Sequence, residues 1–134
     1  MKHVLTTAIL SLLSFSIFSA NPPVKKNTTN RGQLSVQFSG AINLLYSDID
    51  LYVNEKKIGT FSFNDGFSKN FYITKEVNTA KAIVKVMGTV EIVSKCKFIV
   101  NTSKNYTLML QYNHILGNFN FKLVDQSTGE IIEL

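Results

Sequence analysis

From Gln33 onward, apolar and polar residues alternate along the chain with a period of two. Such alternation is typical of a β-strand that turns one face to a core and the other to water. The longest alternating segment runs from Val90 to Val100, where every second residue is apolar or small. The other alternating segments have as their apolar positions Leu34, Val36 and Phe38; Ile49, Leu51 and Val53; Phe61 and Phe63; Phe71 and Ile73; Tyr106, Leu108, Leu110 and Tyr112; and Phe119, Phe121 and Leu123. The pattern therefore predicts a series of half-buried strands.

Turn-forming residues separate these segments, and no stretch of ten residues shows a helical period. Residues 54–57 predict one hairpin. Asn64-Asp65-Gly66 predicts another, because Asn, Asp and Gly tolerate the positive φ of tight hairpins. Short loops and strands spaced at about 8–12 residues favour an all-β, mainly antiparallel, two-sheet β-sandwich of about seven to nine strands at residues 33–134. The large inward residues favour a sandwich over a closed barrel.

The N-terminal segment has the pattern of a secretory signal peptide at residues 1–20. Lys2 supplies a positive charge, an apolar run extends from Val4 to Phe18, and Ala20 ends the segment with a small side chain. The polar residues 21–32 predict a flexible leader. The sequence thus indicates a protein exported by a bacterium to the periplasm, to the cell surface or into the medium. The alternative is a retained anchor, although the apolar run is shorter than the roughly 20 residues of a spanning helix. If the signal is cleaved, no transmembrane segment is expected in the mature chain.

Composition limits the classes of partner that we expect and the interactions that can stabilise the domain. The net charge is +5, but the lysines are scattered and Arg31 is the only arginine. A nucleic-acid-binding protein is expected to show a dense basic block, so we expect no nucleic-acid partner. Cys96 is the only cysteine and cannot form an internal disulfide. The strand pattern around Cys96 places it on the inward face, where a free cysteine behaves as a small apolar residue.

The sequence contains no set of residues that predicts catalysis, a metal site or a cofactor site. His114 is the only histidine beyond the signal segment, and it lies in a predicted turn, where a surface role is favoured over a catalytic one. Asp48 and Asp50 are two residues apart and would share one face of a strand. Such a pair can bind Ca²⁺ or act as acid and base, but a solvated strand face is the simpler interpretation.

Three tyrosines are the candidate binding residues of the surface. Tyr46, Tyr52 and Tyr72 fall on the polar side of their strands or in a loop. Exposed tyrosines can stack on sugars or anchor a protein partner, and they can equally fill the periphery of a small sandwich.

Two stretches together resemble a family of exported β-sandwich domains. Residues 49–61 contain a strand, a short turn, Lys57-Ile58-Gly59 and a second strand, which resembles the hairpin of PEGA-like domains. Residues 98–130 are similar to the C-terminal half of small bacterial envelope proteins of that kind. The chain departs from the family at residues 77–80, where Pro-Gly is usual before the middle strand. The resemblance implies a fold, an export compartment and an accessory or binding role, and it implies no reaction.

The resulting hypothesis is a non-enzymatic exported β-sandwich that binds a protein or a glycan of the cell envelope. One alternative is an envelope hydrolase that uses Asp48 and Asp50. A second alternative is a structural subunit that assembles through its sheet edges.

Overall fold

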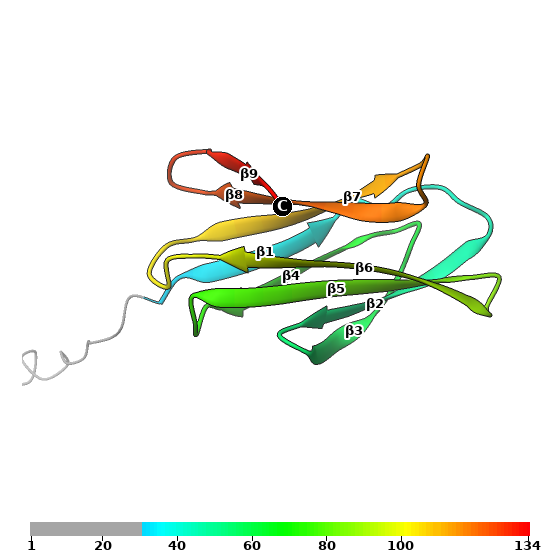
Figure 1. Ribbon diagram of the computed structural model, residues 1–134, viewed down its shortest axis with the longest axis horizontal. Coiled ribbons are helices and arrows are strands. Elements are labelled where there is room, and N and C mark those ends of the chain that lie inside the picture. The colour runs from blue at the N-terminus through cyan, green and yellow to red at the C-terminus, as the bar shows by residue number, and fades with distance from the viewer. Residues whose placement is uncertain (1–30) are drawn as a thin grey trace, which may run out of the picture. The chain divides into compact units, whose positions relative to one another are not determined.

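The computed structural model describes residues 31–134, which form nine strands in two sheets (Figure 1). The strands are β1 (Gln33–Phe38), β2 (Tyr46–Val53), β3 (Lys56–Ser62), β4 (Phe67–Tyr72), β5 (Val77–Val86), β6 (Val90–Ile99), β7 (Tyr106–Asn113), β8 (Asn118–Asp125) and β9 (Ile131–Glu133). The described residues contain no helix. The all-β prediction and the predicted range of strand number are therefore confirmed.

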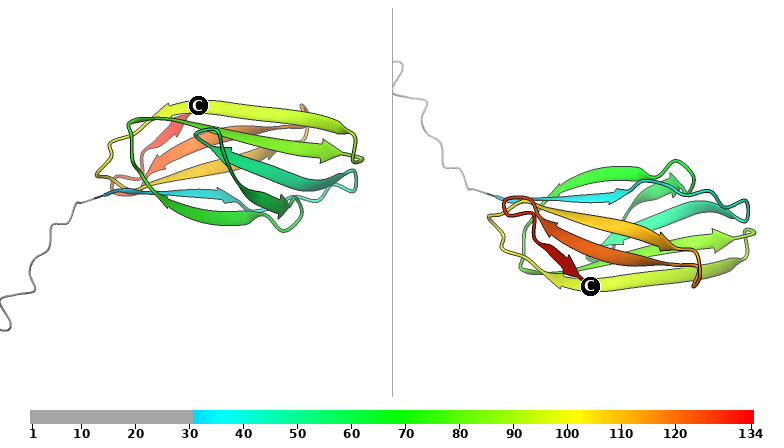
Figure 2. Two further views of the ribbon diagram at one scale, coloured as in Figure 1. Left: turned by 90° about the horizontal axis from the view of Figure 1, so that it is seen from below. Right: turned by 90° about the horizontal axis from the view of Figure 1, so that it is seen from above.

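The two sheets pack face to face as a β-sandwich (Figure 2). The five-stranded sheet has the order β4-β1-β7-β8-β9, and the four-stranded sheet has the order β3-β2-β5-β6. All strand pairs are antiparallel except β1 and β7, which run parallel. The prediction of mainly antiparallel sheets is confirmed.

Strands that follow one another along the chain either form a hairpin or cross between the sheets. Hairpins join β2 to β3, β5 to β6, β7 to β8 and β8 to β9, whereas the other four connections change sheet. The first hairpin turns at Asn54 and Glu55, which both have positive φ. This geometry matches the twist of the strands that the turn joins.

The predicted hairpin at Asn64-Asp65-Gly66 is wrong, because β3 pairs only with β2 and β4 pairs only with β1. The tight turn itself is present, and Gly66 has a φ of 75°. A side chain at Gly66 would collide with the backbone of Phe38, so glycine is needed for close approach as well as for φ. Just before the turn, Phe63 is fully buried between the sheets. Burial of this ring carries the chain from one sheet to the other.

Strand β5 was not predicted from the sequence, although it pairs along its whole length with β6. Ala80 and Ala82 are buried and face the core, while Lys81 and Lys85 alternate with them. The alternation has a period of two, but small alanines replace the large apolar residues that mark the other strands. Strand β5 lies between β2 and β6 in the four-stranded sheet.

The core lies between the sheets and is built from the inward positions of six strands, β1, β2 and β5 to β8, and from residues that directly follow strands. Its buried apolar residues are Leu34, Val36, Phe38, Ile49, Leu51, Phe63, Ile73, Ala80, Ala82, Val84, Phe98, Val100, Tyr106, Leu108, Leu110, Phe119, Phe121 and Leu123. The half-buried thiol of Cys96 packs against this core, as the strand pattern predicted. Burial raises the pKa of the Cys96 thiol to about 11, because the thiolate would lose its hydration.

One hydrogen bond joins the two sheets directly. The buried backbone N–H of Phe119 on β8 donates to Oγ of Ser94 on β6, at 2.9 Å. At Phe119, the edge of β8 that faces away from β7 has no neighbouring strand in its own sheet, since β9 pairs only with residues 122–124 of β8. Ser94 therefore satisfies an N–H group that the ladder leaves open.

The predicted signal peptide, residues 1–20, lies outside the described residues, as does most of the predicted leader at residues 21–32. Within the leader, Gly32 donates its N–H to the carbonyl of Thr102 and accepts from the N–H of Ile73. This residue is thus hydrogen-bonded into the domain. Among residues 31–134 there is no helix long and apolar enough to cross a membrane.

Candidate binding surface

An open hollow of about 600 Å³ lies on the five-stranded sheet, near the end at which β1 enters its loop to β2. It is lined by Gln37, Phe38, Ser39, Gly40, Ala41, Phe67, Ser68, Met109, Leu110, Gln111, Tyr112 and His114. No carboxylate, ammonium or guanidinium group is part of this lining. The size lies within the range of about 300–1,000 Å³ that is usual for small-ligand sites.

The alternation of side chains between the two faces of each strand determines which polar groups reach the hollow. Gln37 lies between the buried Val36 and Phe38, so its side chain turns away from the core. Its neighbours across the sheet are Ser68 on β4 and Met109 on β7. The amide of Gln37 donates from Nε2 to Oγ of Ser35, at 2.9 Å, which leaves its amide oxygen available as an acceptor.

Gln111 supplies a second amide by the same alternation on β7. It follows the buried Leu110 and is itself exposed. Its cross-strand neighbour on β8 is Asn120, which is also exposed. The outer face of this sheet therefore presents amides and hydroxyls where the inner face presents hydrophobic side chains.

A cluster of aromatic rings supports the hollow from the core side; we call Phe38, Tyr46, Phe63, Tyr112 and Phe119 the aromatic cluster. Phe63 lies at its centre, with ring centroids 5.0 Å from Tyr46 and 5.1 Å from Tyr112 in edge-to-face geometry. The imidazole of His114 meets the ring of Tyr112 edge-on at 4.7 Å. Edge-to-face pairs are favourable because the positive ring edge meets the negative ring face. The rings at the rim are thus held by packing.

Hydroxyl groups link the aromatic cluster to the loops above it. The hydroxyl of Tyr112 accepts from Nδ2 of Asn43, at 3.2 Å, and the hydroxyl of Tyr46 donates to the carbonyl of Gly117, at 3.4 Å. A hydrogen bond with Tyr112, together with burial, raises the pKa of Tyr46 to about 12. The phenol of Tyr46 is therefore neutral at ordinary pH.

The structure does not bring Tyr46, Tyr52 and Tyr72 together. Tyr46 is half-buried in the aromatic cluster, whereas the sequence placed it on the polar side. Tyr52 lies on the outer face of the four-stranded sheet, where Nζ of Lys81 lies 4.5 Å from its ring centre. Tyr72 lies on β4, at the edge of the other sheet, and is 60% exposed. Any binding by these tyrosines would involve separate places on the surface.

Asp48 and Asp50 do share the outer face of β2, as their spacing implies. Asp50 accepts from Oγ1 of Thr60 at 2.6 Å and pairs with Nζ of Lys57 at 3.3 Å. These interactions, that with Thr60 foremost, lower the pKa of Asp50 below its usual value. A carboxyl group with a lowered pKa is a poor proton donor at neutral pH, and neither aspartate lines the hollow.

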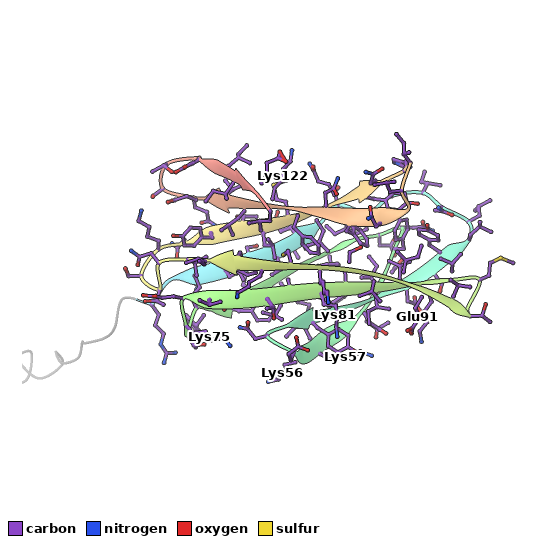
Figure 3. All side chains as sticks on the ribbon, in the orientation of Figure 1. Lys56, Lys57, Lys75, Lys81, Glu91 and Lys122 are labelled. Carbon is purple, nitrogen blue, oxygen red and sulfur yellow. The ribbon has the colours of Figure 1, made fainter. Side chains whose placement is uncertain are left out.

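Five lysines that are scattered in the sequence share the outer face of the four-stranded sheet: Lys57, Lys81, Lys85, Lys95 and Lys97. Figure 3 shows Lys57 and Lys81 projecting on this side of the sandwich and Lys122 on the opposite side. Lys81 and Lys95 are direct cross-strand neighbours. Like charges at opposed positions destabilise a sheet, and the contact between the Lys81 ammonium and the ring of Tyr52 offsets part of this cost.

Within residues 31–134, no three His, Cys, Asp or Glu side chains lie close enough to hold a metal ion. His114 lies in the turn between β7 and β8 that the sequence predicted. Sequence reasoning missed Gln37 and Gln111, because every polar strand position is an equal candidate until the sheet order is known.

Comparison of the chain with protein-family models, with curated proteins and with solved structures finds no match. The resemblance to PEGA-like domains therefore stays a prediction.

Proposed function

We propose that this domain is a non-catalytic binding module of the bacterial cell envelope, and that its hollow takes a short, uncharged segment of a glycan. The observation that carries the proposal is the lining of the hollow. It combines amide and hydroxyl groups from β1, β4 and β7 with the ring of Tyr112, and it contains no Asp, Glu, Lys or Arg.

Neutral sugars present hydroxyl groups that both donate and accept hydrogen bonds, and they present apolar C–H faces. The amides of Gln37 and Gln111 both donate and accept, so they match hydroxyl groups of either orientation. Met109 and the rings at the rim provide apolar surface beside them. Because these groups lie on paired strands, the site exists before the ligand arrives, which lowers the entropic cost of binding.

The test is binding of neutral oligosaccharides built from glucose, galactose and N-acetylhexosamines, by array screening and then calorimetry. Gln111→Ala is expected to weaken binding about tenfold, because one good hydrogen bond is worth about 1.4 kcal/mol. Gln33→Ala is the matched control, since Gln33 is an exposed glutamine on the same face of β1 but outside the hollow.

Two outcomes would contradict the proposal. The first is that the wild-type protein binds none of the sugars at millimolar concentration. The second is that Gln33→Ala and Gln111→Ala weaken binding equally, which would place the ligand elsewhere on the sheet.

The cross-strand pair Lys81 and Lys95 favours a second candidate function. In this function, the outer face of the four-stranded sheet binds an anionic glycan. An anion bridging Lys81 and Lys95 would relieve their repulsion. Such binding would weaken with rising salt, whereas binding in the uncharged hollow would not. Lys95→Gln with a sulfated oligosaccharide as probe distinguishes the two surfaces.

The hydrolase alternative has less support from the contacts. Asp50 is engaged by Thr60 and Lys57, and the face around it is an open sheet surface. Asp48→Asn combined with Asp50→Asn should abolish any hydrolytic activity if this alternative holds.

The sheet-edge alternative also has less support. Of the four edge strands, β9 has only three residues, and the three longer ones all carry lysine: Lys56 and Lys57 on β3, Lys69 on β4, and Lys95 and Lys97 on β6. Lysines and short strands at an edge discourage pairing with another chain. A monomer at micromolar concentration in size-exclusion chromatography with light scattering would exclude assembly through the edges.

A further inference from the structure

Three connections at one end of the sandwich carry large aliphatic side chains that point into solvent. We call Ile42, Leu44, Leu45, Met87, Ile115 and Leu116 the apolar tip. Leu44 is 95% exposed, Ile115 is 92% exposed and Ile42 is 85% exposed. They belong to the β1–β2 loop, the β5–β6 turn and the β7–β8 turn, which all lie at the end opposite the start of β1 (Figure 1). Clustered exposed hydrophobic residues of this kind mark an interaction site.

Hydrogen bonds hold the three connections together. The N–H of Met87 donates to the carbonyl of Leu45, at 2.8 Å, and joins the β5–β6 turn to the β1–β2 loop. The bond from Asn43 to the hydroxyl of Tyr112 joins the β1–β2 loop to β7, directly before the third connection. The apolar tip is therefore one surface built on the aromatic cluster.

Several backbone N–H groups of the tip already have hydrogen-bond partners within the protein. The N–H of Leu45 donates to Oδ1 of Asn43, at 2.9 Å. The N–H groups of Ile115 and Leu116 both donate to Oδ1 of Asn113, at 2.9 and 3.1 Å. Unpaired backbone groups are costly to remove from water, and here two asparagines pair three of them inside their own loops.

The charge and shape of the apolar tip indicate which kind of partner it binds. The three connections contain no Asp, Glu, Lys or Arg; the nearest turn at this end, between β3 and β4, carries Asp65. None of the six tip residues lines the hollow, and their side chains protrude from loops. A protein partner would need a matching set of cavities, whereas the acyl and headgroup boundary of a bilayer accepts protruding aliphatic side chains of any arrangement.

We propose that the apolar tip inserts into the surface of a lipid bilayer whose headgroups carry no net charge. Insertion removes the exposed aliphatic side chains from water while the asparagine-capped backbone keeps its hydrogen bonds. The hollow lies beside the tip, since Ser39, Gly40, Ala41 and His114 line it. This proposal does not depend on the identity of any ligand in the hollow.

The chain has no tryptophan, so a single introduced tryptophan reports on one place without background. Ile115→Trp probes the tip. Ile99→Trp is the matched control, because Ile99 is 69% exposed but lies on the outer face of β6. The full-length protein is titrated with phosphatidylcholine vesicles, with and without lipids brominated on their acyl chains. The fluorescence of Ile115→Trp is expected to shift to the blue and to be quenched by the brominated lipid, and that of Ile99→Trp is expected to change in neither way.

A second variant tests the energetics in the same vesicles. Leu44→Asp added to Ile115→Trp is expected to raise the lipid concentration needed for half-maximal shift at least tenfold, because a carboxylate replaces an aliphatic tip residue. The titration is expected to be the same at 0.1 M and 0.5 M salt, since neither the tip nor the headgroups carry a net charge.

Three results would overturn the proposal. One is an unchanged spectrum of Ile115→Trp at millimolar lipid. Another is equal quenching of Ile99→Trp, which would indicate binding through the sheet face or through the N-terminal segment. The third is a lipid-free oligomer that Leu44→Asp converts to a monomer in light scattering, which would make the tip a contact between copies of this chain.

Discussion

Replacing Ser94 by alanine tests how the two sheets are joined. Ser94 and Phe119 are both buried, with exposed fractions of 6% and 4%. The hydroxyl of Ser94 accepts the N–H of Phe119 at 2.9 Å. Alanine keeps the β carbon and removes only the acceptor, so the N–H of Phe119 stays buried without its partner.

The expected loss follows from the cost of an unpaired buried donor. Leaving a buried N–H group unsatisfied costs about 1–3 kcal/mol, and domains of this size are stable by about 5–15 kcal/mol. Ser94→Ala is therefore expected to fold and to lose about 1–3 kcal/mol of unfolding free energy. Equilibrium unfolding in urea measures this loss as a lower midpoint with an unchanged slope, because the surface exposed on unfolding is the same.

The control is Ser68→Ala on β4, the same substitution at an exposed strand position. Its hydroxyl faces solvent, so the expected change is within about 0.5 kcal/mol. If Ser94→Ala also changes the free energy by less than about 0.5 kcal/mol, the N–H of Phe119 has another partner and the argument for a direct link between the sheets fails.

Three further predictions concern the core, acid stability and the thiol. Phe63→Ala is expected to lower the free energy of unfolding in urea by about 3–5 kcal/mol, because it removes a fully buried ring from the aromatic cluster; a loss below about 1 kcal/mol would contradict this packing. The lowered pKa of Asp50 contributes stability that is present above its ordinary pKa of 3.8 and is lost as the pH falls through the lowered value. Thermal unfolding from pH 6 to pH 2 should therefore show a shallower acid decline in Asp50→Asn, and an unchanged decline would refute the role of this pair. Because burial raises the pKa of Cys96 to about 11, the folded protein at pH 8 should react with a disulfide reagent much more slowly than the unfolded chain; equal rates would show an exposed thiol.

The sequence alone was enough to predict the type of the fold. Alternation between hydrophobic and polar residues, as in Leu34, Val36 and Phe38, reports directly which side of a strand is buried. The inward position of Cys96 followed from the same rule. The rule failed for β5, because Ala80 and Ala82 are too small to stand out as core residues even though they are buried.

The sequence could not predict which strands become neighbours. The turn at Asn64-Asp65-Gly66 has the composition of a hairpin, yet its strands lie in different sheets, because local turn chemistry sets the reversal of the chain and not the choice of partner. That choice depends on which apolar faces can be buried together, and this depends on the whole chain.

The surfaces proposed to bind ligands depend on that choice as well. Gln37 and Gln111 meet in one hollow only because β1 pairs with β7, and the lysine pair Lys81 and Lys95 exists only because β5 pairs with β6 in this register. Apart from β5 and Tyr46, the sequence by itself determined the strands and the faces that they bury, since these follow from the local alternation. Tertiary structure decided which outward side chains share a surface, since residues far apart in the chain come together only when the sheets close over the core.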